Sequence, residues 1–140
     1  MNKNDTLSVN ALRGLSLDMI TNAKSGHPGM ALSSAPIIYT LFSRHLVSNP
    51  NDPTWYNRDR FVLSAGHVSA LLYATLHLAG YSIPMEQLKQ FRKLDSITPG
   101  HPELGLTPGV LDLLVKAFHK LSVLQWPKSI FKLFILKVID

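Results

Sequence analysis

Apolar residues recur at helical spacing through the first quarter of the chain. Between Thr6 and Lys24 they lie three or four residues apart, which predicts a helix with Asp5 or Thr6 as its amino-terminal cap. These positions are Leu7, Ala11, Leu12, Leu15, Met19, Ile20 and Ala23. A second helix is expected from Gly29 to His45, and Pro28 is well placed to open it because the fixed backbone angle of proline suits a first turn.

Shorter patterns follow a turn at residues 49–53, which is rich in asparagine and proline. The apolar run from Phe61 to Ser64 is typical of a short buried strand. A third helix is expected over residues 68–79. A fourth, opened by Ser82 and Pro84, is expected to end near Lys93.

The remainder of the first 110 residues is a long loop, residues 95–110. The pattern therefore predicts an α/β fold that is mostly helical, with one short strand of the parallel type.

The length of 140 residues and a hydrophobic content of 46% suit one domain with a real core. No apolar run reaches the roughly 18 residues that span a bilayer, and the first ten residues are too polar for a secretory signal. The sequence has no cysteine, which excludes disulfides and thiolate metal sites and fits a cytoplasmic protein.

The net charge of +5 suggests polyanion binding until its location is considered. The last thirty residues hold five lysines and two aspartates, which supply +3, so residues 1–110 carry +2. No basic stripe with interleaved aromatics occurs in those 110 residues. Nucleic-acid binding is therefore not favoured.

Three of the six histidines directly follow a glycine, in the pairs Gly26-His27, Gly66-His67 and Gly100-His101. Glycine lets the backbone approach a ligand closely, and imidazole donates, accepts or carries a proton near neutral pH. Any single histidine is more often structural, but three in the same setting indicate a pocket lined from separate loops. His45 and His77 have no neighbouring glycine and are interpreted as structural.

The surroundings of the three pairs resemble the amino-terminal signatures of transketolases. The first block is Ser25-Gly26-His27-Pro28-Gly29, preceded by Arg13, Leu17 and Asp18 and followed by Leu32-Ser33. The second is residues 59–67, Asp-Arg-Phe-Val-Leu-Ser-Ala-Gly-His, and the third is residues 98–103, Thr-Pro-Gly-His-Pro-Glu. The resemblance covers residues 7–110, and its motifs are highly specific. It implies that residues 1–110 are the amino-terminal piece of a thiamine-diphosphate-binding fold.

The resemblance also implies a cofactor, a reaction and roles for the loop residues. Thiamine diphosphate would carry a two-carbon ketol unit between ketose and aldose phosphates, in the pentose phosphate pathway, within a homodimer. His27 and His101 would face the substrate and assist proton transfer. His67 would lie near the cofactor diphosphate, and Gly66 and Gly100 would leave room for the ligand. Mg²⁺ or Ca²⁺ accompanies the cofactor in the family, but the Gly-Asp-Gly segment that binds the metal is absent, so no metal ligand is assigned.

Two smaller expectations concern the second block. Arg58, Asp59 and Arg60 are expected to form ion pairs at the surface or at a subunit contact. Family members often carry asparagine where this chain has Ala65, so any hydrogen bond from that position would be lost.

The resemblance stops at Val110, where the family continues into a Gly-rich segment and this chain has no further glycine. Codons for residues 114–128, read from the third base of each, can spell Gly-Gln-Gly-Ile-Ser-Gln-Ala-Val-Gly-Phe-Ala-Met-Ala-Glu, which looks like the missing segment. We therefore expect residues 111–140 to be a non-homologous tail, produced by a small out-of-frame deletion near codons 111–114. The chain would then be an inactive fragment.

The tail ends in a strongly apolar run, residues 129–140, for which no partner is evident in the first 110 residues. A loosely docked or aggregation-prone segment is favoured over a helix on a membrane surface. Three hypotheses remain open: an inactive transketolase fragment, one half of a split transketolase, and a non-enzymatic helical protein whose tail binds membranes or polyanions.

Overall fold

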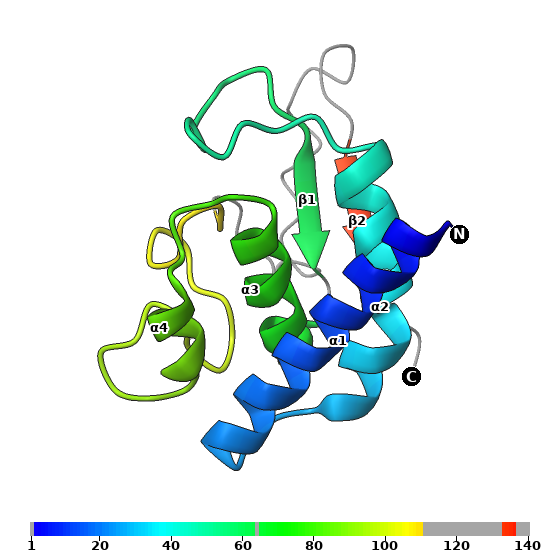
Figure 1. Ribbon diagram of the computed structural model, residues 1–140. Helices are drawn as coiled ribbons and strands as arrows, with labels where there is room; N and C mark the ends of the chain where they lie inside the picture. The colour runs from blue at the N-terminus through cyan, green and yellow to red at the C-terminus, as the bar shows by residue number, and fades with distance from the viewer. Residues whose placement is uncertain (1, 64, 111–132, 137–140) are drawn as a thin grey trace.

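A computed structural model describes residues 2–63, 65–110 and 133–136 of the chain. Three longer helices, α1 (Lys3–Ala23), α2 (Pro28–Arg44) and α3 (Ser69–Leu78), pack beside a short parallel sheet (Figure 1). Helix α1 contacts both α2 and α3, and α2 also contacts α3. The expected α/β class, mostly helical, is confirmed.

Helix α1 begins earlier than the sequence pattern predicts. Asn2 is its amino-terminal cap: its Oδ1 accepts a hydrogen bond from the Asp5 backbone N–H at 2.8 Å, and the Asp5 carboxylate accepts one from the Asn2 N–H at 2.9 Å. This reciprocal pair is a capping box, so the expectation of Asp5 or Thr6 as the cap was wrong. Asp5 is the third residue of the helix and supports the cap from inside.

The Asp5 carboxylate also joins α1 to α2. It accepts a hydrogen bond from the Tyr39 hydroxyl at 2.8 Å and forms an ion pair with Arg44 at 2.7 Å. The pKa of Asp5 is lowered from 3.8 to about 2, first by the hydrogen bond from the Asn2 N–H and then by the Tyr39 hydroxyl and the Arg44 guanidinium. Burial opposes this shift. The carboxylate is thus held in its charged form in the folded state.

We expect this carboxylate to make stability depend on pH in the acid range. Its stabilisation is fully present above the unfolded pKa of 3.8 and is lost as the pH falls toward about 2, because the unfolded chain binds the proton more tightly. Asp5→Asn should lower the free energy of unfolding at neutral pH and remove this part of the acid dependence. Urea unfolding across the acid range measures both effects. Asp18→Asn, on the exposed side of the same helix, should retain the dependence; a variant of Asp5 that also retains it would contradict the assignment.

Helix α2 and strand β1 (Arg60–Leu63) follow the sequence expectations closely. Pro28 occupies the first turn of α2, and the helix ends at Arg44, one residue before the expected end. The strand lies one residue earlier than expected. A short 3-10 helix, η1 (Gly66–Val68), then leads into α3, which confirms the third helix.

Helix α4 (Met85–Lys89) is much shorter than the expected helix that ends near Lys93. Groups from the loop that follows α4 form hydrogen bonds with Gln87, near the carboxyl end of the helix. The Thr98 hydroxyl donates to the Gln87 carbonyl at 2.8 Å, and the Gln87 side chain accepts from the Ile97 N–H at 3.1 Å. The backbone N–H of Arg92 donates to the Thr98 carbonyl instead of continuing the helix. Tertiary contacts therefore end α4 where apolar spacing would continue it.

The segment just before Arg60 is held by backbone contacts. Arg60 is 7% exposed and donates through its guanidinium to the carbonyl oxygens of Tyr56 and Arg58. The Asp59 carboxylate accepts from the Val47 N–H at 2.9 Å. Arg60 is therefore buried over the loop that precedes β1 rather than exposed, and the ion pairs expected for Arg58, Asp59 and Arg60 stay a prediction.

Strand β2 (Leu133–Leu136) lies in the apolar tail and pairs in parallel with β1. The register places Arg60 opposite Leu133 and Leu63 opposite Leu136. The tail therefore does have a partner in the first 110 residues, contrary to the sequence expectation, and these four residues are not part of a membrane-surface helix. The other tail residues lie outside the described part of the chain. No helix among the described residues is long and apolar enough to cross a membrane.

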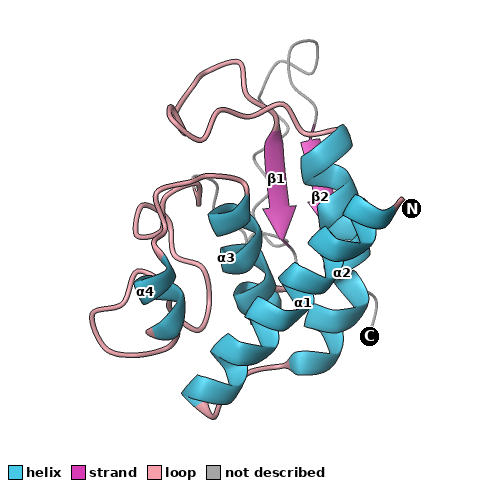
Figure 2. Cartoon of the chain, viewed as in Figure 1, coloured by secondary structure: helices cyan, strands magenta, loops and turns pink. Residues whose placement is uncertain are grey.

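The hydrophobic core is centred on α3. Its first eight residues, 69–76, are all buried, and they pack against α1, α2 and η1. A helix that is apolar on every side requires cover from all directions. The second Gly-His pair lies in η1, directly before α3, and the third lies in the loop that follows α4 (Figure 2). Both segments are thus attached to helices that pack in the core.

Candidate functional site

The first two Gly-His pairs meet at the amino-terminal ends of α2 and α3. His27 caps α2 through its backbone, and His67 lies in η1, directly before α3. The two imidazole rings approach edge to face, with centroids 4.8 Å apart. Nε2 of His67 lies 2.6 Å from the sulfur of Met30, in the first turn of α2. His27 is exposed and His67 is half-buried, so the structure brings together two histidines 40 residues apart at the protein surface.

The third pair lies beside the second because α3 holds its backbone. The Ser69 hydroxyl donates to the Gly100 carbonyl at 2.7 Å, and the Tyr73 hydroxyl donates to the Pro99 carbonyl at 2.9 Å. Ser69 is only two residues beyond His67. The imidazole of His101 is exposed. All three Gly-His loops therefore gather at one end of the core.

Tyr73 keeps the third loop in place through a neutral hydroxyl. Burial raises the pKa of Tyr73 well above its ordinary value of 10, so the group stays protonated and available as a donor. Its ring is fully buried and packs edge to face against Phe91, with centroids 6.1 Å apart.

Packing within the protein explains two of the three glycines. Gly26 has φ +146°, and a Cβ there would lie 2.7 Å from Cγ1 of Ile20. A Cβ on Gly100 would lie 3.2 Å from Nε of Arg92. Gly66 is buried at the start of η1. The backbone and Ile20 therefore require glycine at Gly26, whereas at Gly100 the Arg92 side chain would have to move by a few tenths of an ångström. Room for a ligand at Gly66 and Gly100 stays a prediction.

Arg92 is one residue near the site that the sequence did not single out. Its Nη1 donates to the Ser25 hydroxyl at 2.7 Å, and its backbone has the left-handed φ of +63°. A non-glycine residue in this region costs roughly 1–2 kcal/mol. An arginine inside the expected fourth helix carries no local signal for such a contact, because its partner is 67 residues away.

The other histidines outside the glycine pairs differ in setting. His77, in α3, donates from Nδ1 to the Ile83 carbonyl at 2.7 Å, which agrees with its interpretation as structural. His45 is exposed at the carboxyl end of α2.

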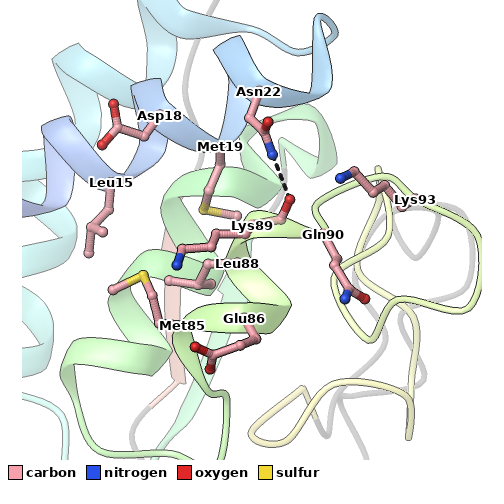
Figure 3. Close-up of a pocket in the computed structure, with 10 residues that line it drawn as sticks. All are labelled: Leu15, Asp18, Met19, Asn22, Met85, Glu86, Leu88, Lys89, Gln90 and Lys93. Atoms are coloured by element: carbon pink, nitrogen blue, oxygen red, sulfur yellow. Dashed lines mark hydrogen bonds between the residues drawn. The ribbon is translucent and has the colours of Figure 1, made fainter.

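A separate hollow of about 500 Å³ lies between α1 and α4 (Figure 3). The Asn22 side-chain amide closes part of it by donating to the Lys89 carbonyl at 2.6 Å. The residues that line it are Leu15, Asp18, Met19, Asn22, Met85, Glu86, Leu88, Lys89, Gln90 and Lys93. None of the Gly-His residues lines this hollow, so it is distinct from the candidate site.

Within the described residues, no three His, Asp or Glu side chains gather in a way that could hold a metal ion.

Comparison with known proteins defines the class of this domain. Residues 4–112 match the family profile described as the transketolase thiamine diphosphate binding domain. The chain is 56% identical to the transketolase of Aquifex aeolicus over 108 residues, and 58% identical to that of Geobacillus stearothermophilus over 106 residues. These alignments cover 77% and 76% of this chain and 16% of each relative.

Solved structures give the same result. The transketolase of Campylobacter jejuni superposes with a TM-score of 0.73 at 54% identity, covering 79% of this chain and 17% of that one. A Pichia stipitis transketolase solved with sedoheptulose-7-phosphate superposes with a TM-score of 0.74 at 48% identity, covering 76% of this chain and 16% of that one. The matched residues thus form part of a thiamine-diphosphate-binding domain. The chain belongs to the transketolase family, and it spans about a sixth of the length of these relatives.

Proposed function

We propose that residues 1–110 form the amino-terminal wall of a transketolase active site. The contact between His27 and His67, with ring centroids 4.8 Å apart, carries this proposal because it joins two separate Gly-His loops at one surface. The full-length enzyme would transfer a two-carbon ketol unit between ketose and aldose phosphates as a homodimer. The absence of cysteine fits a cytoplasmic location.

Imidazole rings, which can donate hydrogen bonds, suit an anionic, hydroxyl-rich ligand. When bound, thiamine diphosphate supplies the carbanion chemistry that carries the two-carbon unit. We assign His67 as a hydrogen-bond donor toward the diphosphate, with Gly66 and Gly100 presenting backbone at close range. His27 and His101, both exposed on loops, would move protons to and from substrate oxygens. Mg²⁺ or Ca²⁺ would be bound outside this chain, since the Gly-Asp-Gly metal segment does not occur in the sequence.

We expect no measurable ketol transfer from the 140-residue chain alone. Catalytic groups must be held in the correct geometry by the remainder of the active site, and misplacement costs orders of magnitude in rate. A coupled assay with xylulose-5-phosphate, ribose-5-phosphate, thiamine diphosphate and Mg²⁺ measures this. Turnover that depends on thiamine diphosphate and disappears on His67→Ala or His101→Ala would contradict the expectation.

A chimera tests the proposed roles directly. Residues 4–110 of this chain would replace the matching segment of the Aquifex aeolicus transketolase, and the chimera should be active. His101→Ala should then lower kcat by about 10²-fold or more, in the range of general acid–base catalysis, whereas His67→Ala should mainly raise the thiamine diphosphate concentration required. His45→Ala is the matched control, because this exposed histidine has no neighbouring glycine. Equal effects from all three substitutions would refute the assignment.

We propose that residues 111–140 are a frameshifted tail rather than part of the domain. The family match ends at residue 112, which supports a boundary near the one expected from the sequence. Sequencing the gene around codon 111 tests this proposal: the transketolase-like reading should resume in another frame beyond codon 114. If no such reading is found, the tail is an authentic part of the protein and the half-enzyme or binding-protein hypotheses gain weight.

A further inference from the structure

Arg92 connects the first and third Gly-His loops. Its Nη1 donates a hydrogen bond to the Ser25 hydroxyl at 2.7 Å, and Ser25 directly precedes Gly26-His27. On its other side the guanidinium packs against Gly100, where an added Cβ would lie 3.2 Å from Nε and 3.3 Å from Cζ. One side chain thus contacts both loops immediately before their histidines.

These contacts close into a ring when the second loop is included. The His27 and His67 rings touch, and two residues beyond His67 the Ser69 hydroxyl binds the Gly100 carbonyl. A closed ring holds every loop from two sides, so the loss of one contact loosens two loops at once. The members of the ring, in order, are Ser25, His27, His67, Ser69, Gly100 and Arg92.

The backbone around Arg92 is fixed in an uncommon conformation. Its φ of +63° is rarely adopted by residues with side chains, and its N–H donates to the Thr98 carbonyl at 3.0 Å. Its Cζ lies 5.4 Å from the centre of the Phe91 ring. The Nε–H is buried and has no hydrogen-bond acceptor among the residues that the structure describes. A strained backbone and an unsatisfied donor persist where the surroundings define the position of a group, which points to a requirement for this side chain.

We propose that Arg92 is a positioning residue of the candidate site, which fixes the separation of His27 and His101 through Ser25 and Gly100. Arginine suits this task because its guanidinium is planar and offers several fixed donors. The flat face packs on a glycine that carries no side chain, and one edge reaches the serine hydroxyl. The inference rests on the proposed function only for the role given to the two histidines, since the contacts themselves are independent of any ligand.

NMR of the histidine rings in the 140-residue chain tests the connection. Ser25→Ala removes the acceptor and leaves Arg92 intact. We expect the ring signals of both His27 and His101 to shift and broaden, and the cross-peak between the His27 and His67 rings to be lost. The signals of His45 and His77 should not move. Ser25→Thr retains the hydroxyl and should restore the native spectrum.

Arg92→Gln gives a second measurement, with Arg13→Gln as its matched control. Arg13 also joins two helices, by donating from Nε to the Leu32 carbonyl at 3.0 Å, and this acceptor lies within α2 rather than in a Gly-His loop. Both substitutions should lower the melting temperature, whereas only Arg92→Gln should change the signals of His27 and His101. If the Arg92→Gln variant fails to fold, the comparison of the histidine signals in Ser25→Ala and Ser25→Thr tests the inference.

Two outcomes would overturn the inference. One is an unchanged His101 signal in Ser25→Ala, and the other is an equal change of the histidine signals in Arg13→Gln. An inactive chimera combined with the expected NMR changes would remove the proposed function while leaving the positioning role in place.

Discussion

Phe91→Ala is expected to destabilise the chain by about 3–5 kcal/mol, the range measured for truncation of a large buried aromatic side chain. Phe91 is 2% exposed and follows the short helix α4. Its ring packs edge to face on Tyr73, and the Arg92 guanidinium lies above it. The substitution would therefore leave a cavity and also loosen two residues that hold the third Gly-His loop.

Urea unfolding followed by circular dichroism measures this loss. Because small domains have a total stability of only about 5–15 kcal/mol, the variant should have a much lower unfolding midpoint or be unfolded at 25 °C. Leu94→Ala is the matched control, since Leu94 lies three residues further along and is 91% exposed. It should change the stability by less than about 0.5 kcal/mol. Similar losses for the two variants would show that Phe91 is not a core residue.

Gly109→Ala is expected to have the second largest effect, about 3 kcal/mol, from backbone strain and overpacking together. Gly109 has φ +88°, which a residue with a Cβ adopts only under strain. The added carbon would lie 2.7 Å from Cδ1 of Tyr81 and 3.0 Å from Cδ2 of Leu76, and both side chains are buried. Neither neighbour can move without opening the core beside α3.

Gly105→Ala separates the two contributions to this loss. Gly105 has a similar φ of +77°, but a Cβ there meets no atom within 4 Å. It should therefore show the backbone strain alone, roughly 1–2 kcal/mol. Thermal or urea unfolding of both variants gives the comparison. Equal losses at Gly105 and Gly109 would mean that contact with Tyr81 adds nothing.

Helix α1 was predictable because it repeats its apolar positions over several turns, and Pro28 marks the start of α2 as expected. Helix α3 was expected over residues 68–79 and is found at Ser69–Leu78. The extent of α4 was not predictable, since the hydroxyl of Thr98 and the side chain of Gln87 rearrange its carboxyl end. Contacts of this kind depend on a loop that arrives ten residues later, so local spacing does not reveal them.

The candidate site was predictable from its motifs but not from its supports. The glycine before each histidine is visible in the sequence, and the family match over residues 4–112 confirms the family to which those motifs point. Arg92 and Ser69 were missed, because a single arginine or serine carries no pattern and their partners lie 67 and 31 residues away. The roles of His27, His67 and His101 toward a ligand stay predictions.

The pairing of β1 with β2 determines the order in which the chain can fold. Arg60 and its partner Leu133 are separated by 73 positions (133 minus 60), so the sheet closes a very long loop. Closing such a loop costs entropy that local helix formation does not, and distant pairings slow folding. During synthesis, the three helices around the core can assemble while the tail is still in the ribosome. We therefore expect the sheet to form after the helices, with the edge of β1 unpaired until residues 133–136 reach it.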